Sequence, residues 1–350
     1  MAEKAGLSSG GDVLIIGGGI SGVTVASELA QSGIPFTLIE KESSLGGLAA
    51  SFCCKASESC NKCFACVVDK RISEIHQGQG ISILTRTEVT GVKTNGGKHQ
   101  VTLKRGNEKI DIEVSAVVVA AGIDPFAASQ KVEYGYGRYK NVITAKDLDE
   151  MLRFRGILSR PSDGILPKTI AFFQCVGSRD ESIGNLYCSQ VCCAYALRLI
   201  KAIRYSYPEV KATFLHVDIQ PAGASFQKLL DSCREDKGVR LIRSLPSKIY
   251  PSPLSDTLRV RLVDPEKGEV VEDLFDLVVL SVGMVLSKQA RHLTELFGLS
   301  LTEDGFIASP PLQRGIFATG ACSGPKDIDR SMLHAKSVAF LVQQHLRERS

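Results

Sequence analysis

The sequence predicts an α/β fold in which one architecture, a parallel sheet with an antiparallel meander in its crossover, occurs twice. Three observations support this prediction. A glycine-rich turn follows an apolar run near the N-terminus, the same order of strand signals returns in the second half, and a cysteine-containing turn stands where a second glycine-rich turn is expected. The 350 residues suffice for two domains, and 44% hydrophobic with 23% charged residues is the composition of an ordinary globular protein.

Charge and cysteine content narrow the class of protein. The formal net charge is +4, and no block of five like charges suggests a nucleic-acid partner. The first apolar run, residues 13–20, is short and ends in glycines, so we expect a buried strand and no signal peptide or direct membrane span. We therefore expect a cytoplasmic protein, whose 11 cysteines point to metal or redox chemistry before structural disulfides.

The glycine-rich turn has the GxGxxG pattern between a predicted strand, residues 12–16, and a predicted helix, residues 23–31. Gly17 makes the tight turn, Gly19 lets the backbone approach a pyrophosphate, and Gly22 permits close packing of helix and strand. The N-terminus of the following helix attracts phosphate charge. The pattern therefore predicts a dinucleotide site.

The identity of the dinucleotide follows from the next strand, residues 36–39. It ends in Glu40, about 20 residues past the glycines, where a carboxylate binds a ribose 2′-OH, which favours FAD or NAD over a 2′-phosphate. Gly46 and Gly47 then resemble the continuation in flavoprotein reductases of the glutathione reductase and thioredoxin reductase type, where it passes beside FAD. We therefore expect FAD and a two-dinucleotide-binding-domain flavoprotein fold of that type.

Later signals complete the first copy. Residues 89–94, 100–104 and 110–114 alternate as an antiparallel meander, and residues 116–122 read as a buried strand ending at glycine. Near the C-terminus, a run resembling the Ala-Thr-Gly-Asp of these reductases has Ala321 in place of the aspartate, and a helix over residues 331–347 follows. The candidate FAD-binding residues are Gly17, Gly19, Ile20, Ser21, Gly22, Glu40, Lys41, Gly46, Gly47, Leu48, Val89, Ala121, Gly122, Gly320, Ala321 and Ile328.

The second copy begins with the strand at residues 169–173 and repeats the meander and the closing strand over residues 247–283. Only Gly177 survives in its first turn, and one glycine cannot provide the close backbone approach that a pyrophosphate needs. We expect an FAD-binding domain of residues 1–160 plus 288–350, and a degenerate NAD-type domain of residues 161–287 that has lost its nicotinamide site.

Four cysteines stand in and after the altered turn: Cys175, Cys188, Cys192 and Cys193. A helix starting near Asn185 would place Cys188 and Cys192 on one face, with its dipole stabilising thiolates and Cys175 closing the site from the strand end. The spacing favours an iron-sulfur site. Structural zinc, which adjacent cysteines fit poorly, and buried apolar thiols are the alternatives.

The other cysteines stay open. Cys60, Cys63 and Cys66 imitate a ferredoxin run, but its fourth cysteine and proline are missing. Together with Cys53 and Cys54 they could line a loop beside the flavin, form a disulfide, or supply a redox thiol. Cys322 could lie near the flavin or simply fill a tight space, and Cys233 reads as a plain, partly buried thiol.

These motifs resemble the A subunit of heterodisulfide reductase and its shorter relatives over nearly the whole chain. The most specific segments are residues 175–180, 187–193 and 324–328, and the pair Cys63 and Cys66. The resemblance implies FAD in a thioredoxin-reductase-like fold and a [4Fe-4S] cluster on Cys175, Cys188, Cys192 and Cys193.

The length of the chain resembles the short A subunit of the heterodisulfide-reductase-like complex of sulfur-oxidising bacteria, because no further ferredoxin-type domain is present in this sequence. That resemblance implies B and C subunits, a lipoate-binding protein system and a homodimer. The expected function is electron transfer by an oxidoreductase subunit in sulfur-compound oxidation. The alternatives are the A subunit of a quinone-interacting oxidoreductase, a stand-alone NADH or thiol-disulfide reductase, and a non-catalytic assembly scaffold. No catalytic residue is assigned, since no general base or Ser/His/Asp arrangement stands out.

Overall fold

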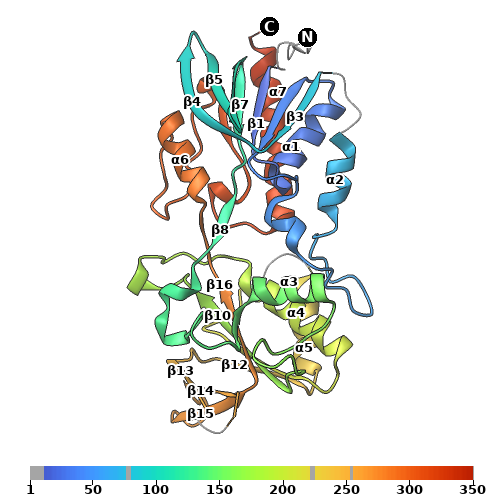
Figure 1. Cartoon of the computed structure of the whole chain (residues 1–350), viewed down its shortest axis with the longest axis vertical. Coiled ribbons are helices and arrows are strands. Elements are labelled where there is room, and N and C mark those ends of the chain that lie inside the picture. The colour runs from blue at the N-terminus through green and yellow to red at the C-terminus, as the bar shows by residue number, and fades with distance from the viewer. Residues whose placement is uncertain (1–11, 76–79, 221–224, 253–254, 350) are drawn as a thin grey trace. The chain divides into compact units, whose positions relative to one another are not determined.

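The computed structural model describes residues 12–75, 80–220, 225–252 and 255–349. The chain divides into two compact units. The first unit comprises Met1–Ala50, Phe64–Asp124 and Val285–Ser350, and the second comprises Ser51–Cys63 and Pro125–Met284. Each unit is built on a five-stranded parallel sheet and a three-stranded antiparallel sheet (Figure 1).

The first unit has the strand order β18-β7-β1-β2-β3 in its parallel sheet and the meander β4-β5-β6 beside it. Apolar runs such as Val13–Ile16 are buried on both faces, as parallel strands require. The strands are β1 Val13–Ile16, β2 Phe36–Glu40, β3 Ile81–Thr85, β4 Thr87–Asn95, β5 Lys98–Arg105, β6 Glu108–Val114, β7 Ala116–Val119 and β18 Ile316–Ala318. The helices are α1 Ile20–Gln31, α2 Val67–Ile75, α6 Lys288–Phe297 and α7 Ile328–Arg347, with short 3₁₀ turns η1 Gly47–Ser51, η5 Leu312–Arg314 and η6 Gly320–Ser323.

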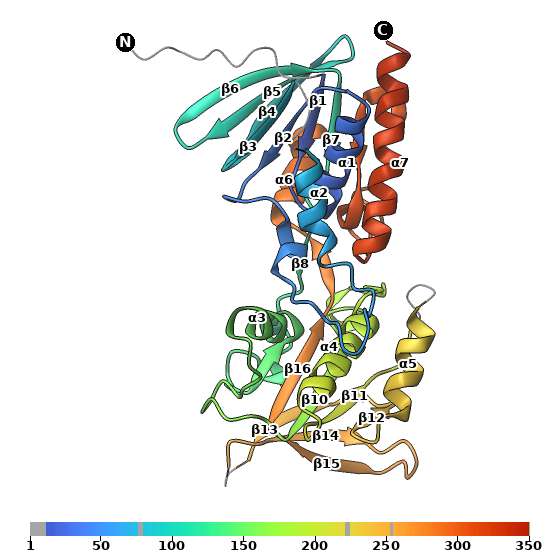
Figure 2. The same cartoon turned by 90° about the vertical axis from the view of Figure 1, so that its right-hand side faces the viewer.

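Two apolar layers enclose the first sheet. On one face, α1 and α7 lie side by side and pack with α2 against Val13, Ile15 and Phe36. On the other face, the meander and α6 pack against Leu14 and Ile16 (Figures 1 and 2). The alternation of inward side chains along β1 therefore supplies both cores.

The second unit repeats this plan. Its parallel sheet has the order β12-β11-β10-β16-β9, and its meander is β13-β14-β15. The strands are β9 Val142–Thr144, β10 Thr169–Val176, β11 Lys211–Leu215, β12 Val239–Ile242, β13 Lys248–Pro251, β14 Leu258–Val263, β15 Val270–Phe275 and β16 Leu277–Val282. The helices are α3 Ala145–Arg155, α4 Cys192–Ser206 and α5 Phe226–Glu235, with 3₁₀ turns η2 Ala128–Gln130, η3 Val132–Tyr134 and η4 Glu181–Ile183. Helices cover one face of the sheet and the meander covers the other, so the predicted duplication is confirmed.

The unit boundaries differ from the predicted ones in three places, the smallest being residues 285–287, which belong to the first unit. Residues 125–160 belong to the second unit because β9 pairs with β16 and extends the second sheet. Residues 51–63 also belong to it, although they follow the first glycine-rich turn in sequence. The short strands β8 Ile123–Pro125 and β17 Met284–Leu286 pair with each other where the chain passes from one unit to the other.

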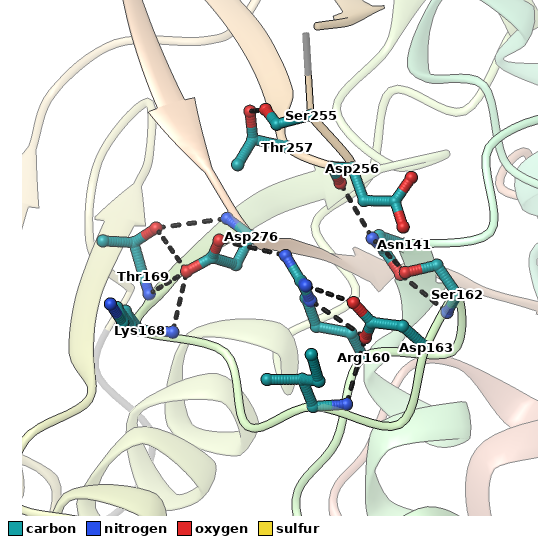
Figure 3. Close-up of polar contacts among 11 residues, drawn as sticks. Asn141, Arg160, Ser162, Asp163, Lys168, Thr169, Ser255, Asp256, Thr257 and Asp276 are labelled. Atoms are coloured by element: carbon teal, nitrogen blue, oxygen red, sulfur yellow. Dashed lines mark hydrogen bonds and ion pairs between the residues drawn. The ribbon is translucent and has the colours of Figure 1, made fainter.

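A polar network fixes the amino ends of β10 and β16 (Figure 3). One oxygen of Asp276, just before β16, accepts hydrogen bonds from the backbone N–H groups of Lys168 and Thr169 at 2.7 and 3.0 Å. Arg160 contacts the other oxygen at 3.4 Å and also pairs with Asp163. Because this network lies at the amino ends of the strands, it leaves the opposite, carboxyl edge of the sheet for function.

Candidate functional site

The turn between β1 and α1 has the geometry that its glycines predict. Gly17 has φ +106°, and a Cβ atom there would lie 2.5 Å from the carbonyl oxygen of Ala120. A Cβ atom on Gly22 would overlap the carbonyl oxygen of Gly17. At Gly19, by contrast, an added Cβ atom meets nothing within 4 Å. The turn is therefore closed where helix and strand touch and open where a ligand would approach.

The N-terminus of α1 is prepared for an anion. No side chain caps the helix at Gly19, and its first turn holds no acidic residue. The leading N–H groups of a helix, here on Ile20, Ser21 and Gly22, have no acceptor within the helix. These groups and the helix dipole suit the pyrophosphate of a dinucleotide.

Glu40 lies at the carboxyl end of β2 and is buried. Its two oxygens accept hydrogen bonds from the backbone N–H groups of Gly18 and Glu42, at 2.7 and 2.9 Å. The carboxylate is thus held beside the glycine turn, where the sequence predicts a ribose ligand. A cavity of about 280 Å³ adjoins the end of this strand and is lined by Lys41, Arg86, Thr87, Glu88, Lys104 and Gly106.

The cavity contains the predicted residue Lys41, but sequence reasoning missed its other two cations, Arg86 and Lys104. Arg86 has φ +53°, a conformation that non-glycine residues rarely adopt, and the sequence carries no signal for it. Arg86 precedes β4 and Lys104 lies in β5, so the meander brings them to Lys41 only in the folded unit.

The second glycine pair packs onto the first turn. Gly46 donates its N–H to the carbonyl oxygen of Gly18 at 2.7 Å, and a Cβ atom on Gly47 would lie 2.9 Å from the Cα atom of Gly19. From the C-terminal segment, a Cβ atom on Gly320 would overlap Oγ of Ser21. Two segments distant in sequence, residues 46–47 and Gly320, therefore pack against this turn.

The remaining predicted FAD-binding residues lie in several different elements of the first unit. Ala121 and Gly122 follow β7, and the carbonyl oxygen of Ala121 accepts a hydrogen bond from Ser287 at 3.0 Å. Leu48 lies in η1, Ala321 in η6, Ile328 opens α7, and Val89 is buried in the apolar core that the meander forms with the sheet. The buried hydroxyl of Thr319, missed by the sequence reasoning, has no hydrogen-bond partner among the described residues and lies beside η6. This open, donor-rich turn fits FAD.

The four predicted ligand cysteines all lie in the second unit at the carboxyl end of β10 and the start of α4. Cys175 is the last residue but one of β10, where the ladder to β16 shifts register. Cys192 and Cys193 are the first two residues of α4. The predicted helix start near Asn185 is wrong, because Gln190 takes φ +59° and interrupts any helix there. Cys188 therefore lies in the preceding loop, not one helical turn from Cys192.

The thiols interact with one another. Hydrogen bonds from Cys175 and Cys193, the larger effects, hold the pKa of Cys192 well below its usual value. The pKa values of the two donors are raised by those same bonds and by burial. Burial also raises the pKa of Cys188, whose sulfur accepts the N–H of Gln190 at 3.3 Å. The arrangement favours a thiolate at the uncapped N-terminus of α4.

Most of the non-glycine residues with positive φ lie in or beside the two cysteine-containing tracts. Six non-glycine residues in the described part of the chain have positive φ. Three of them, Cys175, Arg179 and Gln190, lie in this loop, and Lys62 and Phe64 flank Cys63 in the other cysteine tract. Such conformations cost about 1–3 kcal/mol each and persist where the surroundings demand them. The strain marks both tracts as functional candidates.

The surroundings of Cys175 fit a bound group. The side-chain oxygen of Gln174 and the hydroxyl of Ser178 are buried, and neither has a hydrogen-bond partner in the part of the chain that the structure describes. Buried polar atoms are nearly always paired, so these two favour a ligand near them. Within the described ranges, no three or more His, Cys, Asp or Glu side chains form a group that could hold a single metal ion. The thiols, the strained loop and the unpaired polar atoms are together compatible with an iron-sulfur cluster.

All 11 cysteines are free thiols. Cys54, Cys60 and Cys66 are exposed and Cys63 is half-buried, whereas burial raises the pKa of Cys53 to about 12. Cys322 is fully buried, and its sulfur donates to the carbonyl oxygen of Thr319 at 3.1 Å. Cys233 is buried in α5.

A buried ion pair anchors the tract that contains Cys53. Nζ of Lys55 lies 2.6 Å from Asp149 of α3, and the two side chains are only 1% and 0% exposed. Asp149 also accepts hydrogen bonds from the backbone N–H of Cys53 and the hydroxyl of Tyr195, both at 2.6 Å. This pairing, which no local pattern predicts, explains why residues 51–63 belong to the second unit.

Sequence comparison finds a match to one protein family and similarity to the A subunits of heterodisulfide reductases. Residues 12–140 match the pyridine nucleotide-disulphide oxidoreductase family. The chain is 31% identical to the iron-sulfur A 2 subunit of the CoB–CoM heterodisulfide reductase of Methanopyrus kandleri, over 93% of this chain and 63% of that one. It is 39% identical to the A subunit of the H₂:CoB-CoM heterodisulfide,ferredoxin reductase of Methanothermobacter marburgensis, over 66% of this chain and 37% of that one. The chain thus spans less than two thirds of the length of these relatives.

Solved structures agree on the fold. The thioredoxin reductase of T. acidophilum superposes with a TM-score of 0.64 at 16% identity, covering 97% of this chain and 99% of that one. The thioredoxin reductase of Lactococcus lactis gives 0.62 at 17% identity with the same coverage. In the described residues, no helix is long and apolar enough to cross a membrane. The chain therefore has the thioredoxin-reductase-like two-domain fold, its residues 12–140 match an oxidoreductase family, and its sequence is similar to those of the A subunits of heterodisulfide reductases.

Proposed function

We propose that this chain is the FAD- and [4Fe-4S]-containing electron-transfer subunit of a heterodisulfide-reductase-like complex acting in sulfur-compound oxidation. One observation carries the proposal. Four interacting cysteines, Cys175, Cys188, Cys192 and Cys193, lie from the end of β10 to the start of α4, where the fold of the first unit has its glycine turn. Electrons would then enter or leave this unit through the cysteines and not through a bound nucleotide.

Each unit has its own task in this proposal. When bound, FAD supplies two-electron chemistry and the cluster supplies one-electron chemistry. The N–H groups at the start of α1 would hold the pyrophosphate, and Glu40 would bind the ribose. The candidate cluster ligands are the four thiols, and the N-terminus of α4 would stabilise their negative charge.

The partners we propose are B- and C-type subunits, a lipoate-binding protein system and a second copy of the chain. Support comes from the relatives, whose names describe them as A subunits of heterodisulfide reductases. We propose sulfur oxidation from the resemblance to the short A subunits, and a cytoplasmic location because the first apolar run, residues 13–20, reads as a buried strand.

Iron and acid-labile sulfide analysis after anaerobic reconstitution tests the cluster. The wild type should bind about four irons per chain, as a [4Fe-4S] cluster requires. Cys192→Ser should lose most of this iron, because Cys192 interacts with both Cys175 and Cys193. The matched control is Cys233→Ser, a buried thiol of the same unit outside the proposed ligand set, which should keep the wild-type content. Unchanged iron in Cys192→Ser would refute the ligand assignment.

A second candidate function is a stand-alone thiol-disulfide reductase. The exposure of Cys60 and Cys66, with strained residues on both sides of Cys63, favours it. In that case the purified chain alone should reduce a disulfide with NADH and lose this activity in Cys63→Ala. If the purified chain does not reduce a disulfide with NADH, this result supports the electron-transfer role.

A further inference from the structure

The second meander, β13-β14-β15, has an inner and an outer side, because successive side chains of a strand point to opposite sides. Ile249, Val260 and Phe275 point inwards and are buried against the parallel sheet of the same unit. The residues between them point outwards. These outward residues, which we call the outer face of the second meander, are Lys248, Tyr250, Arg259, Arg261, Val263, Val270, Glu272 and Leu274.

Three aliphatic side chains of this outer face are exposed. Val263 and Val270 lie opposite each other in the pairing of β14 with β15, and they are 46% and 57% exposed. Leu274, four residues further along β15, is 57% exposed and lies opposite Arg259. A meander with one solvated side normally carries polar residues there, so apolar side chains gathered on that side mark a contact surface.

Cations lie between these apolar positions. Lys248 lies opposite Arg261, and Arg261 lies opposite Glu272 in the neighbouring strand. Nζ of Lys248 lies 5.0 Å and Cζ of Arg259 5.9 Å from the centre of the Tyr250 ring, and these cation–π contacts hold the ring in place. Arg259 also contacts Glu272 at 3.5 Å. The face therefore has three cations, one carboxylate and a fixed tyrosine, and Tyr and Arg are enriched among the residues that dominate binding energy at interfaces.

The first meander shows that the fold does not require apolar residues on this side. Its outward residues in β5 and β6 are all polar: Lys98, Gln100, Thr102, Lys104, Lys109, Asp111 and Glu113. Lys98 pairs with Glu113 at 2.9 Å, and Thr102 donates a hydrogen bond to Asp111 at 2.6 Å. The polar groups of the first meander thus pair with one another, whereas the outer face of the second meander exposes apolar side chains and excess positive charge.

Charge and area indicate which kind of partner fits. Two copies of the face would bring six cations, three from each, against two carboxylates, and like charges in contact oppose association. Glu266 and Glu269 lie in the turn beyond Val263, at the rim, where charges act on the association rate more than on affinity. Three strands and three rows of outward residues span about 14 by 20 Å, or about 300 Å². A stable interface buries about 800 Å² per partner, so the face fits a smaller, reversible contact with an acidic protein.

We propose that the outer face of the second meander is a docking site for an acidic protein, whose carboxylates pair with the cations of the face and whose apolar side chains cover its three aliphatic residues. The inference rests on the proposed function, which supplies the candidates: the B-type subunit, the C-type subunit and the lipoate-binding protein. The meander and α4 cover opposite sides of the parallel sheet. The contact therefore serves assembly and not electron entry at Cys192 and Cys193, which open α4.

Biolayer interferometry tests the inference. The FAD- and iron-reconstituted full-length chain is immobilised, and each of the three proposed partners, purified separately, is the analyte. The wild type should bind at least one of them, with a dissociation constant that rises with the NaCl concentration. Leu274→Ser should raise the dissociation constant about tenfold, mainly through faster dissociation. Lys248→Gln combined with Arg261→Gln should raise it by a similar factor through slower association, and should weaken its dependence on salt.

Lys98→Gln combined with Lys109→Gln is the matched control, because it removes the same charge from the outward side of the first meander. This control should bind the partner like the wild type. The FAD and iron contents of all variants should equal those of the wild type, because substitutions of exposed side chains change stability little. If Leu274→Ser loses its iron, the double charge variant decides in its place.

A partner that binds all variants equally overturns the inference and leaves the proposed function standing. Binding of none of the three partners by the wild type overturns the inference, and the iron analysis then judges the proposed function separately. Three other interactions are measured with the same variants by sedimentation: with phosphatidylglycerol vesicles, with duplex DNA and with a second copy of the chain. Loss of one of these in the variants, with partner binding unchanged, assigns the face to a membrane, a nucleic acid or self-association and overturns the inference.

Discussion

The two units share a strand order but differ in the turn after the first strand. In the first unit, β1 ends just before Gly17, and the chain leads directly into α1. In the second unit, β10 ends in Cys175 and Val176, and 15 residues separate it from α4, which begins at Cys192. The sheet, the meander and the covering helices are otherwise equivalent. The two units therefore share a sheet topology and differ in the length and composition of the turn after the first strand.

The two units also differ in the partners of the acidic residue at the end of the neighbouring strand, which is Glu40 for β2 and Asp218 for β11. Glu40 accepts hydrogen bonds from backbone N–H groups and keeps the remaining capacity of its oxygens for a ribose. Asp218, which follows the corresponding strand β11, is paired with Arg179 and Gln220. The carboxylate of the second unit is therefore engaged by side chains, whereas that of the first unit is held by backbone N–H groups beside the glycine turn.

The largest effect is expected from a substitution in the glycine turn between β1 and α1 of the first unit. Gly22→Ala places a Cβ atom against the carbonyl oxygen of Gly17 and should abolish FAD binding. FAD per chain, measured from the absorbance of flavin released after reconstitution, checks this. Gly91→Ala in β4, where the nearest atom lies 3.8 Å from an added Cβ, should bind FAD like the wild type. Normal FAD content in Gly22→Ala would show that the close contact is dispensable.

The second largest effect concerns the tract of residues 51–63, which packs on the second unit. Asp149→Asn leaves Lys55 buried without its counter-ion and should destabilise the second unit by about 3–5 kcal/mol. Denaturant unfolding followed by circular dichroism measures it. Removing the second charge as well, as in Lys55→Met with Asp149→Asn, should recover most of the loss, because the amide oxygen can still accept from the Cys53 N–H and the amide N–H groups can donate to the Tyr195 hydroxyl. A surface control, Lys98→Met, removes the exposed pair with Glu113 and should leave stability unchanged.

The sequence was sufficient for what local patterns encode. Gly17, Glu40 and the two meanders lie where the periodicity and the glycines predicted, and Cys175 lies at the end of its strand. The start of α4 could not be predicted, because the left-handed conformation of Gln190 has no sequence signal. The contact between Lys55 and Asp149 joins residues far apart in sequence, so no local pattern could reveal it.

The third prediction sharpens the comparison of the two acids. Glu40→Gln removes a charged acceptor of two backbone N–H groups, and such bonds contribute about 1.5–3 kcal/mol. The dissociation constant of FAD should therefore rise about tenfold or more, as measured by calorimetric titration. Asp218→Asn is the matched variant in the second unit and should bind FAD like the wild type. Equal losses in both variants would contradict the assignment of FAD to the first unit.

The smallest expected effect lies at the amino ends of the strands, where Asp276 precedes β16 (Figure 3) and Ser115 precedes β7. Ser115 contributes its N–H to the carbonyl oxygen of Asp12, whereas the Asp276 side chain accepts the N–H groups of Lys168 and Thr169. Asp276→Ser gives the second unit the residue of the first. Because a serine cannot reach both N–H groups, it should cost about 1–3 kcal/mol, less than Asp149→Asn.

The same unfolding measurement decides this case. Asp273→Ser, on the more exposed strand β15, provides the control and should change stability by no more than about 0.5 kcal/mol. A loss confined to Asp276→Ser means that the second unit has its own anchor at the strand ends, in addition to its own ligand turn. If both substitutions are neutral, the backbone pairing of β9, β10 and β16 alone holds these ends, and the units differ only at their carboxyl edges.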